Sequence, residues 1–161
     1  MRKAIVSGAN GFVGSAVVKE LISQGYEVYA LVRENHYDQV PINEMVRIVP
    51  FSLENIEALG EVIPINEYEA FYHFAWNGSA GVDRADTALQ LKNAQWTVEC
   101  LQMAKRLGCK RFVPAGSIME HETIAAVYTQ GNRPGAGYIY GSGKVAAHMM
   151  CMSMAVKEVI N

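Results

Sequence analysis

Apolar and polar positions follow one another along the chain in blocks that predict strands and helices in turn. Short, mostly apolar runs predict strands at 3–7, where the run is β-branched, and at 27–32, 46–51, 70–76 and 111–115. Apolar residues at helical spacing predict helices at 12–22, 53–62, 85–107 and 140–159, with an irregular start near Asp83 for the third. Gly25 and Gly108 stand where a glycine ends a helix. The last helix follows a loop that contains Gly131, Pro134, Gly135 and Gly137.

Strands that alternate with helices predict an α/β fold in which a doubly wound parallel sheet forms the middle of three layers. No internal repeat and no linker divides the sequence, so residues 1–161 are expected to form a single domain. The composition agrees, because 50% of the residues are hydrophobic and 19% are charged. One globular domain with a substantial core is the prediction.

Charge and cysteine content narrow the class of protein further. The chain carries 14 Lys+Arg against 16 Asp+Glu, and this balance offers no basic stripe to a nucleic acid. Its mean hydropathy is +0.04, and its apolar runs are too short for a membrane span or a signal peptide. The three cysteines lack metal-ligand spacing. We therefore expect a cytoplasmic protein with reduced thiols.

Three glycines, Gly8, Gly11 and Gly14, lie between the first predicted strand and the first predicted helix. Glycine permits the tight turn, the close approach of backbone to a pyrophosphate and the close helix–strand contact of a dinucleotide site. The spacing is one residue longer than the commonest G-x-G-x-x-G fingerprint, and an ordinary turn is the alternative. The strand–turn–helix context favours NAD(P) binding in a Rossmann-type fold. The candidate residues of this loop are Gly8, Asn10, Gly11, Phe12, Val13 and Gly14.

The end of the second predicted strand bears on the choice of cofactor. Arg33 lies where a carboxylate would bind the adenosine ribose of NAD, and its guanidinium could pair with the 2′-phosphate of NADP. A solvated arginine, or ribose binding by Glu34, is the alternative. The sequence favours NADP over NAD.

Tyr140, Lys144 and Ser117 are the candidate catalytic residues. Tyr140 and Lys144 are four residues apart and share one face of the last predicted helix. A lysine ammonium beside a phenol lowers the pKa of the phenol, which suits a proton donor or acceptor near neutral pH. Ser117 follows the fifth predicted strand, at the edge where α/β proteins bind ligands. A pair of surface side chains without chemistry is the alternative for Tyr140 and Lys144.

Together these motifs resemble the extended short-chain dehydrogenase/reductases, the NAD(P)-dependent epimerase/dehydratase group that acts on nucleotide sugars. Residues 73–76 resemble the strand-four H-x-A motif of that group, Asn93 matches an asparagine of its long helix, and residues 111–117 resemble its fifth strand. The resemblance implies that Tyr140 is the general acid/base, that Lys144 orients the tyrosine and the nicotinamide ribose, and that Ser117 polarises the substrate carbonyl. It also implies cofactor contacts from Phe74, Ala75, Trp76, Asn93 and Lys144. A non-catalytic NAD(P)-binding fragment or sensor is the alternative function, and reduction, epimerisation and dehydration stay open.

The sequence departs from that group at two places. Gly116-Ser117 replaces a serine pair, and residues 119–122 replace a valine-tyrosine-glycine segment; Glu120, His121 and Glu122 are expected in a solvated loop rather than in a substrate site. The later strands and the substrate domain of the group are also expected to be missing, which would leave an exposed sheet edge. Met149, Met150, Met152 and Met154 lie in the last predicted helix. Methionine suits both core packing and adaptable interfaces, so packing of this helix on the sheet is one interpretation. The resemblance implies the other, in which the helix pairs with another subunit, and we expect a homodimer.

Overall fold

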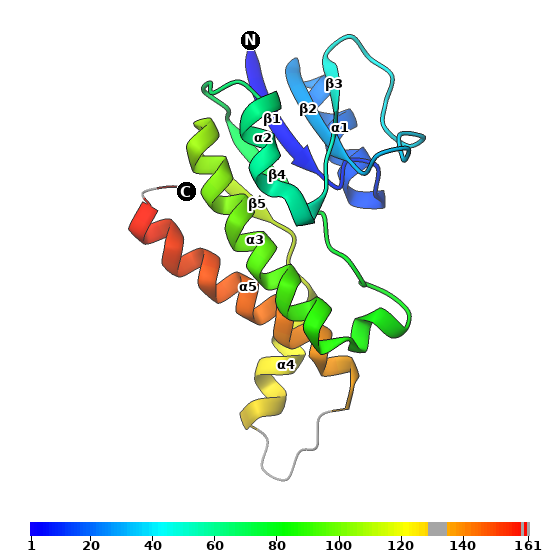
Figure 1. Ribbon diagram of the computed structural model, residues 1–161, viewed down its shortest axis with the longest axis vertical. Helices are drawn as coiled ribbons and strands as arrows, with labels where there is room; N and C mark the ends of the chain where they lie inside the picture. Colours follow the sequence, from blue (N-terminus) through cyan, green and yellow to red (C-terminus); the bar gives the residue numbers. More distant parts are fainter. Residues whose placement is uncertain (129–134, 159, 161) are drawn as a thin grey trace.

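The computed structural model describes residues 1–128, 135–158 and 160 (Figure 1). Its strands are β1 (Arg2–Ser7), β2 (Tyr26–Val32), β3 (Val46–Pro50), β4 (Ala70–His73) and β5 (Phe112–Pro114). Its helices are α1 (Phe12–Ser23), α2 (Leu59–Val62), α3 (Thr87–Leu107), α4 (Ile118–Tyr128) and α5 (Gly137–Glu158), with 3-10 helices η1 (Leu53–Ala58) and η2 (Val82–Ala85). Gly131, Pro134 and Val159, which the sequence places before and at the end of the last helix, lie outside the described residues.

All five strands are parallel, in the order β3-β2-β1-β4-β5. Ser7, the last residue of β1, pairs with Leu31 of β2 on one side and with His73 of β4 on the other. From β1 the chain adds β2 and β3 toward one edge of the sheet and then β4 and β5 toward the other edge. The strand order therefore reverses between β1 and β4. Ligands of open α/β sheets bind at such a switch point, outside the carboxyl ends of the strands.

Helices cover both faces of the sheet, so the predicted three-layer Rossmann-type fold is confirmed. Alternate strand residues point to opposite faces. On one face Ala4, Val6, Val28 and Ala30 pack with Val18 and Leu21 of α1. On the other face Ile5, Tyr29, Leu31 and Phe71 pack with residues of α2, α3 and α5, including Leu59, Trp96, Leu101 and Cys151. Figure 1 shows α3 and α5 side by side on this second face.

The strand and helix boundaries agree with the sequence predictions at most ends. Gly25 (φ 77°) and Gly108 (φ 89°) are left-handed residues after α1 and α3, as predicted, and η2 is the expected irregular start near Asp83. The predicted strand 70–76 instead ends at His73. Beyond it, α3 side chains bind the chain from Trp76 onward. The predicted helix 53–62 is divided into η1 and α2.

Residues 119–122 form part of helix α4, so the predicted loop is wrong, although His121 and Glu122 are exposed to solvent. The hydroxyl of Ser117 accepts a hydrogen bond from the Met119 amide (3.2 Å), and Glu120 Oε1 accepts one from the Ser117 amide (2.6 Å). This reciprocal pair is a variant of the capping box in which the serine binds the second rather than the third amide, and it stabilises the first turn of the helix. The S-x-x-E sequence of residues 117–120 is the local signal that would have predicted the helix.

Two glycines in α5 allow it to pass close to both α4 and α3. A Cβ atom on Gly141 would overlap the Thr123 hydroxyl of α4, and one on Gly143 would lie 2.9 Å from the carbonyl oxygen of Gln90 in α3. Glycine is required at these positions by close packing rather than by a turn. Tyr140 and Lys144 flank this crossing, which fixes both residues between two other helices.

The outer surface of α5 is apolar along part of its length. Met149, Met150 and Met152 are exposed, whereas Met154 packs against the core. Among the described helices, none is both long and apolar enough to span a membrane. The three cysteines are buried, and all have free thiols.

Candidate functional site

The glycine loop has a geometry that two of its glycines make possible. Gly8 has a φ of 67°, and a Cβ atom there would lie 2.8 Å from the amide nitrogen of Ala75. A Cβ atom on Gly14 would overlap the carbonyl group of Gly8. Gly11 precedes α1, and no side chain caps the helix, so its first amide groups are open to an anion.

A cavity of about 270 Å³ lies over this loop, at the carboxyl ends of β1, β2 and β4. Seven residues predicted to bind the cofactor line it: Gly8, Asn10, Gly11, Arg33, Phe74, Ala75 and Trp76. Phe51, Ser52, Leu53, Asn77 and Ser79 also line it but were not predicted. Phe12 and Val13 expose their side chains to solvent and do not line the cavity, so their backbone amides at the N-terminus of α1 are the groups they offer to a ligand. The glycine loop, which has no Cβ atoms at positions 8, 11 and 14, and the open N-terminus of α1 together fit a dinucleotide pyrophosphate.

Arg33 is exposed at the end of β2, next to a hollow that Glu34 also lines. In residues 1–128, 135–158 and 160, no carboxylate forms an ion pair with Arg33. The Asn10 side chain donates a hydrogen bond to the carbonyl of His36 (2.9 Å), which ties the segment after β2 to the glycine loop. The guanidinium is therefore available to a ligand at this end of the cavity.

His73 is the centre of a buried polar network behind the cavity. Its Nδ1 lies 2.8 Å from the Ser7 hydroxyl, and its Nε2 lies 3.3 Å from the Thr97 hydroxyl. Thr97 uses its one hydrogen on the carbonyl of Asn93 (2.8 Å), so we assign the imidazole proton to Nε2 and the accepting role to Nδ1. Burial, aided by the charge of Lys144, lowers the pKa of His73 to about 3. His73 is a neutral connection between β1, β4 and α3.

Two α3 side chains hold the segment after β4 in place. Asn93 accepts a hydrogen bond from the Asn77 amide (2.9 Å) and donates one to the Asn77 carbonyl (2.7 Å). Gln90 accepts from the Trp76 indole (2.9 Å) and donates to the carbonyl of Asp83 (2.9 Å). Asn93, expected to contact the cofactor, thus positions the cavity wall. Gln90 was not predicted, and only its i, i+3 relation to Asn93 links the two in the sequence.

Tyr140 and Lys144 are both buried and lie close together on α5. This agrees with the prediction that the two residues share one face of a helix. The Lys144 ammonium donates a hydrogen bond to the carbonyl of Ala115 (3.1 Å) and lies 3.7 Å from the centre of the Trp76 ring. It is 5.9 Å from the centre of the Tyr140 ring. Burial lowers the pKa of Lys144 to about 8, against an opposing effect from Glu120. A lysine in this setting changes charge within a pH range accessible to the folded protein.

The Tyr140 ring meets two further side chains. The Trp76 ring meets it edge-on at 5.9 Å, and the Arg84 guanidinium lies 4.4 Å from its centre. Arg84 was not predicted as a site residue. Ser117, the third candidate catalytic residue, is half-buried at the start of α4, where its hydroxyl accepts the capping hydrogen bond from Met119.

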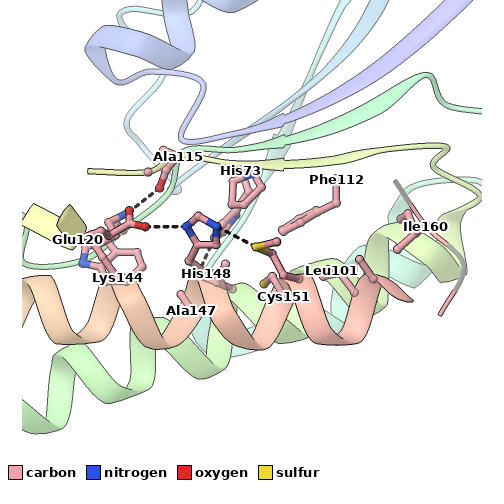
Figure 2. A pocket seen from close by; sticks show the side chains of 16 residues that line it. His73, Leu101, Phe112, Ala115, Glu120, Lys144, Ala147, His148, Cys151 and Ile160 are labelled. Atoms are coloured by element: carbon pink, nitrogen blue, oxygen red, sulfur yellow. Dashed lines mark hydrogen bonds and ion pairs between the residues drawn. The ribbon is translucent and has the colours of Figure 1, made fainter. Parts of the chain in front are cut away.

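A second cavity, of about 400 Å³, opens between β5 and α5 (Figure 2). Lys144, Glu120 and His148 line its polar end, and Leu101, Phe112, Cys151 and Ile160 are among the residues of its apolar end. His148 Nδ1 and Glu120 Oε2 lie 2.7 Å apart in a hydrogen bond, an ion pair when His148 is protonated, that joins α5 to α4. The Glu120 side chain is only 12% exposed, so it faces this cavity instead of belonging to a solvated loop. Trp76 lines both cavities and separates them.

Comparisons with known proteins agree with this geometry. The chain is 29% identical over 119 residues to the dTDP-6-deoxy-L-talose 4-dehydrogenase (NAD(+)) of Aggregatibacter actinomycetemcomitans, a match that covers 72% of this chain and 42% of the relative. The fold is similar to a UDP-galactose 4-epimerase structure (TM-score 0.78, 21% identity, covering 99% of this chain and 53% of that one). It is also similar to the Bordetella bronchiseptica enzyme WbmG in complex with NAD (TM-score 0.74, 18% identity, covering 94% and 49%).

The chain spans about half the length of these relatives. Structural likeness at such low identity establishes the fold, and the sequence itself establishes the family. Residues 4–161 match the NAD dependent epimerase/dehydratase family, in agreement with the resemblance that the glycine loop and the tyrosine–lysine pair indicated. The chain therefore belongs to the NAD dependent epimerase/dehydratase family.

Proposed function

We propose that this chain provides the cofactor site and the acid–base residues of an NAD(P)-dependent oxidoreductase or epimerase that acts on a nucleotide sugar. One observation carries the proposal: Tyr140 and Lys144 are buried against Trp76, and Trp76 also forms a wall of the glycine-loop cavity. The candidate acid–base pair and the candidate cofactor site are thus separated by a single side chain.

Several described residues support binding of a dinucleotide. Gly8, Gly11 and Gly14 would hold the pyrophosphate with the N-terminus of α1, and Arg33 would face the adenosine ribose. Lys144 would bind the nicotinamide ribose. When bound, the cofactor supplies or accepts the hydride. We favour NADP, because Arg33 takes the place of a ribose-binding carboxylate and no described carboxylate neutralises it.

The side chains of this chain would perform the proton transfer. Tyr140 would exchange a proton with the substrate hydroxyl while the Lys144 ammonium stabilises the negative charge that develops on the phenol oxygen. The hydroxyl of Ser117 accepts a hydrogen bond from the Met119 amide and keeps its own hydrogen for the substrate carbonyl. These are the three roles that general acid–base catalysis at a carbonyl requires.

The relatives support a nucleotide sugar as the substrate. One is named as a dehydrogenase of dTDP-6-deoxy-L-talose, and the structure of MoeE5, similar at a TM-score of 0.66 and 22% identity, contains UDP-glucose and NAD. We also propose a homodimer that covers Met149, Met150 and Met152 of α5, and a cytoplasmic location in which the three thiols stay reduced.

Substitution of Tyr140 tests the function. Tyr140→Phe should reduce turnover of dTDP- and UDP-sugars by about 100-fold or more, because general acid–base catalysis contributes that much, while NAD(P) affinity stays the same. Tyr138→Phe, on the same helix, is the matched control and should retain activity. Wild-type turnover by Tyr140→Phe would contradict the assignment, and NAD(P) binding without turnover by the unmodified chain would indicate the non-catalytic alternative.

A further inference from the structure

Arg84 contacts the candidate acid–base residue from an element outside the family motifs. It lies in η2, between β4 and α3, and its guanidinium carbon is 4.4 Å from the centre of the Tyr140 ring. A guanidinium at this distance over an aromatic face is attracted by the negative face of the ring. The contact places a permanent positive charge beside the phenol.

The position of Arg84 is fixed by neighbours on both sides. Gln90 donates a hydrogen bond to the carbonyl of Asp83 (2.9 Å) and so holds η2 to α3. One guanidinium nitrogen of Arg84 donates to the carbonyl of Ser79 at 3.4 Å. With the Tyr140 ring on its face, the guanidinium is held near the site without being enclosed, since the residue is only half-buried.

The charge of Arg84 is not neutralised by the protein. In the part of the chain that the structure describes, no carboxylate lies within ion-pair distance of its guanidinium. The carboxylate of Asp86, two residues away, instead caps α3 by accepting a hydrogen bond from the Leu89 amide (3.0 Å). Most of the five guanidinium N–H groups of Arg84 therefore stay available to an acceptor from outside the chain.

The location separates Arg84 from the cofactor's phosphates. The cavity over the glycine loop is lined on this side by Asn77 and Ser79, and Arg84 is not among its lining residues. A planar guanidinium binds carboxylates and phosphates in a bidentate manner, which a neutral hydroxyl cannot match. The chemistry thus points to an anionic group of the substrate.

We infer that Arg84 is a substrate-binding residue that recognises an oxyanion, a carboxylate or a phosphate, close to the hydroxyl that Tyr140 serves. The inference rests on the proposed function and specifies its substrate class. An anion held there would orient the reacting carbon toward Tyr140, because the guanidinium is itself positioned by the tyrosine ring. A substrate without such a group would lose this orientation.

Binding measurements with probes of different charge test the inference. The protein saturated with NAD is titrated calorimetrically with UDP-glucose, UDP-glucuronic acid and UDP. Arg84→Gln should lower the affinity for each probe that carries the recognised anion by about ten-fold or more, since a charge-assisted bidentate contact is lost. A loss limited to UDP-glucuronic acid identifies a sugar carboxylate, and an equal loss for all three identifies the diphosphate. Arg84→Lys should restore part of the affinity.

Two controls separate recognition from folding and from the cofactor. Arg84→Met keeps an apolar side chain against Tyr140, so it should fold normally and lose the same affinity as Arg84→Gln. Arg111→Gln removes an exposed arginine that precedes β5, at the opposite end of the sheet, and should change nothing. The inference is overturned if the wild-type protein binds none of the probes, if their affinities survive in Arg84→Gln and Arg84→Met, or if NAD affinity falls instead. If the affinities survive the substitutions or NAD affinity falls instead, NAD binding and Tyr140-dependent turnover still leave the proposed function intact. A wild-type protein that binds none of the probes would count against the proposed function as well.

Discussion

The Lys144 ammonium lies 3.7 Å from the centre of the Trp76 indole ring. This contact joins the tyrosine–lysine pair of α5 to the segment that follows β4, and the Gln90 side chain holds the same indole through its N–H group. Because Trp76 lines both cavities, it stands between Lys144 and the cavity over the glycine loop.

The lowered pKa of Lys144 predicts an effect on stability. Its pKa is 10.5 in the unfolded chain and about 8 in the folded protein, because burial disfavours the charged form. Between these values the unfolded state binds more protons, so stability rises with pH from about 8 to 10.5, and the full cost is present below pH 8. Lys144→Met should abolish turnover yet raise the free energy of unfolding at pH 7 by about 1–3 kcal/mol.

Urea unfolding at pH 7 and at higher pH measures this effect. The gain in stability from Lys144→Met should shrink as the pH rises above 8. Lys92→Met, at an exposed position of α3, is the control and should show neither the gain nor the pH dependence. A variant that is less stable than wild type at pH 7 would show that the contacts with Trp76 and Ala115 outweigh the cost of burial.

Removal of the Glu120 carboxylate should loosen α4. Glu120→Ala deletes both the capping hydrogen bond to the Ser117 amide and the ion pair with His148. We expect a loss of about 1–2 kcal/mol in the free energy of unfolding, since helix caps contribute about this much. Amide hydrogen exchange in the first turn of α4 should accelerate. Glu122→Ala, at an exposed position on the same helix, should change both quantities little, and equal effects of the two substitutions would contradict the cap.

A methyl group on Gly14 should disrupt the glycine loop. Its Cβ atom would overlap the carbonyl group of Gly8, which belongs to the backbone and cannot move aside. Gly14→Ala should therefore lower the free energy of unfolding by about 2 kcal/mol or more and abolish NAD(P) binding. Gly60→Ala is the matched control, because the nearest atom to its Cβ would be 3.7 Å away on the flexible Arg106 side chain. Thermal unfolding and cofactor titration of both variants would measure the difference.

Arg33 should control the preference between the two dinucleotides. A charge-assisted contact with the 2′-phosphate contributes about 1.5–3 kcal/mol, so Arg33→Ala should weaken NADP binding about ten-fold or more. NAD affinity should change little, because NAD lacks that phosphate. Fluorescence titrations with both cofactors test the prediction, and equal losses for the two would reject it.

The sequence by itself predicted the features that depend on near neighbours in the chain. The short apolar runs, the helical spacing and the terminating Gly25 and Gly108 predicted the parallel α/β fold, because strand and helix periods are local properties. The glycine loop and the Tyr140–Lys144 pair were equally visible, since each lies within one turn or helix. Helix α4 was missed although its local signal, the S-x-x-E capping box at Ser117, was present.

The tertiary structure decided which side chains meet around Tyr140. Arg84 of η2, Trp76 after β4 and Lys144 of α5 converge on one ring, and the Glu120–His148 ion pair joins two helices. No periodicity in the sequence encodes these contacts, because they depend on how closely α5 crosses α3 and α4. That closeness is set by the absence of a Cβ atom at positions 141 and 143, and it also buries Lys144 deeply enough to shift its pKa.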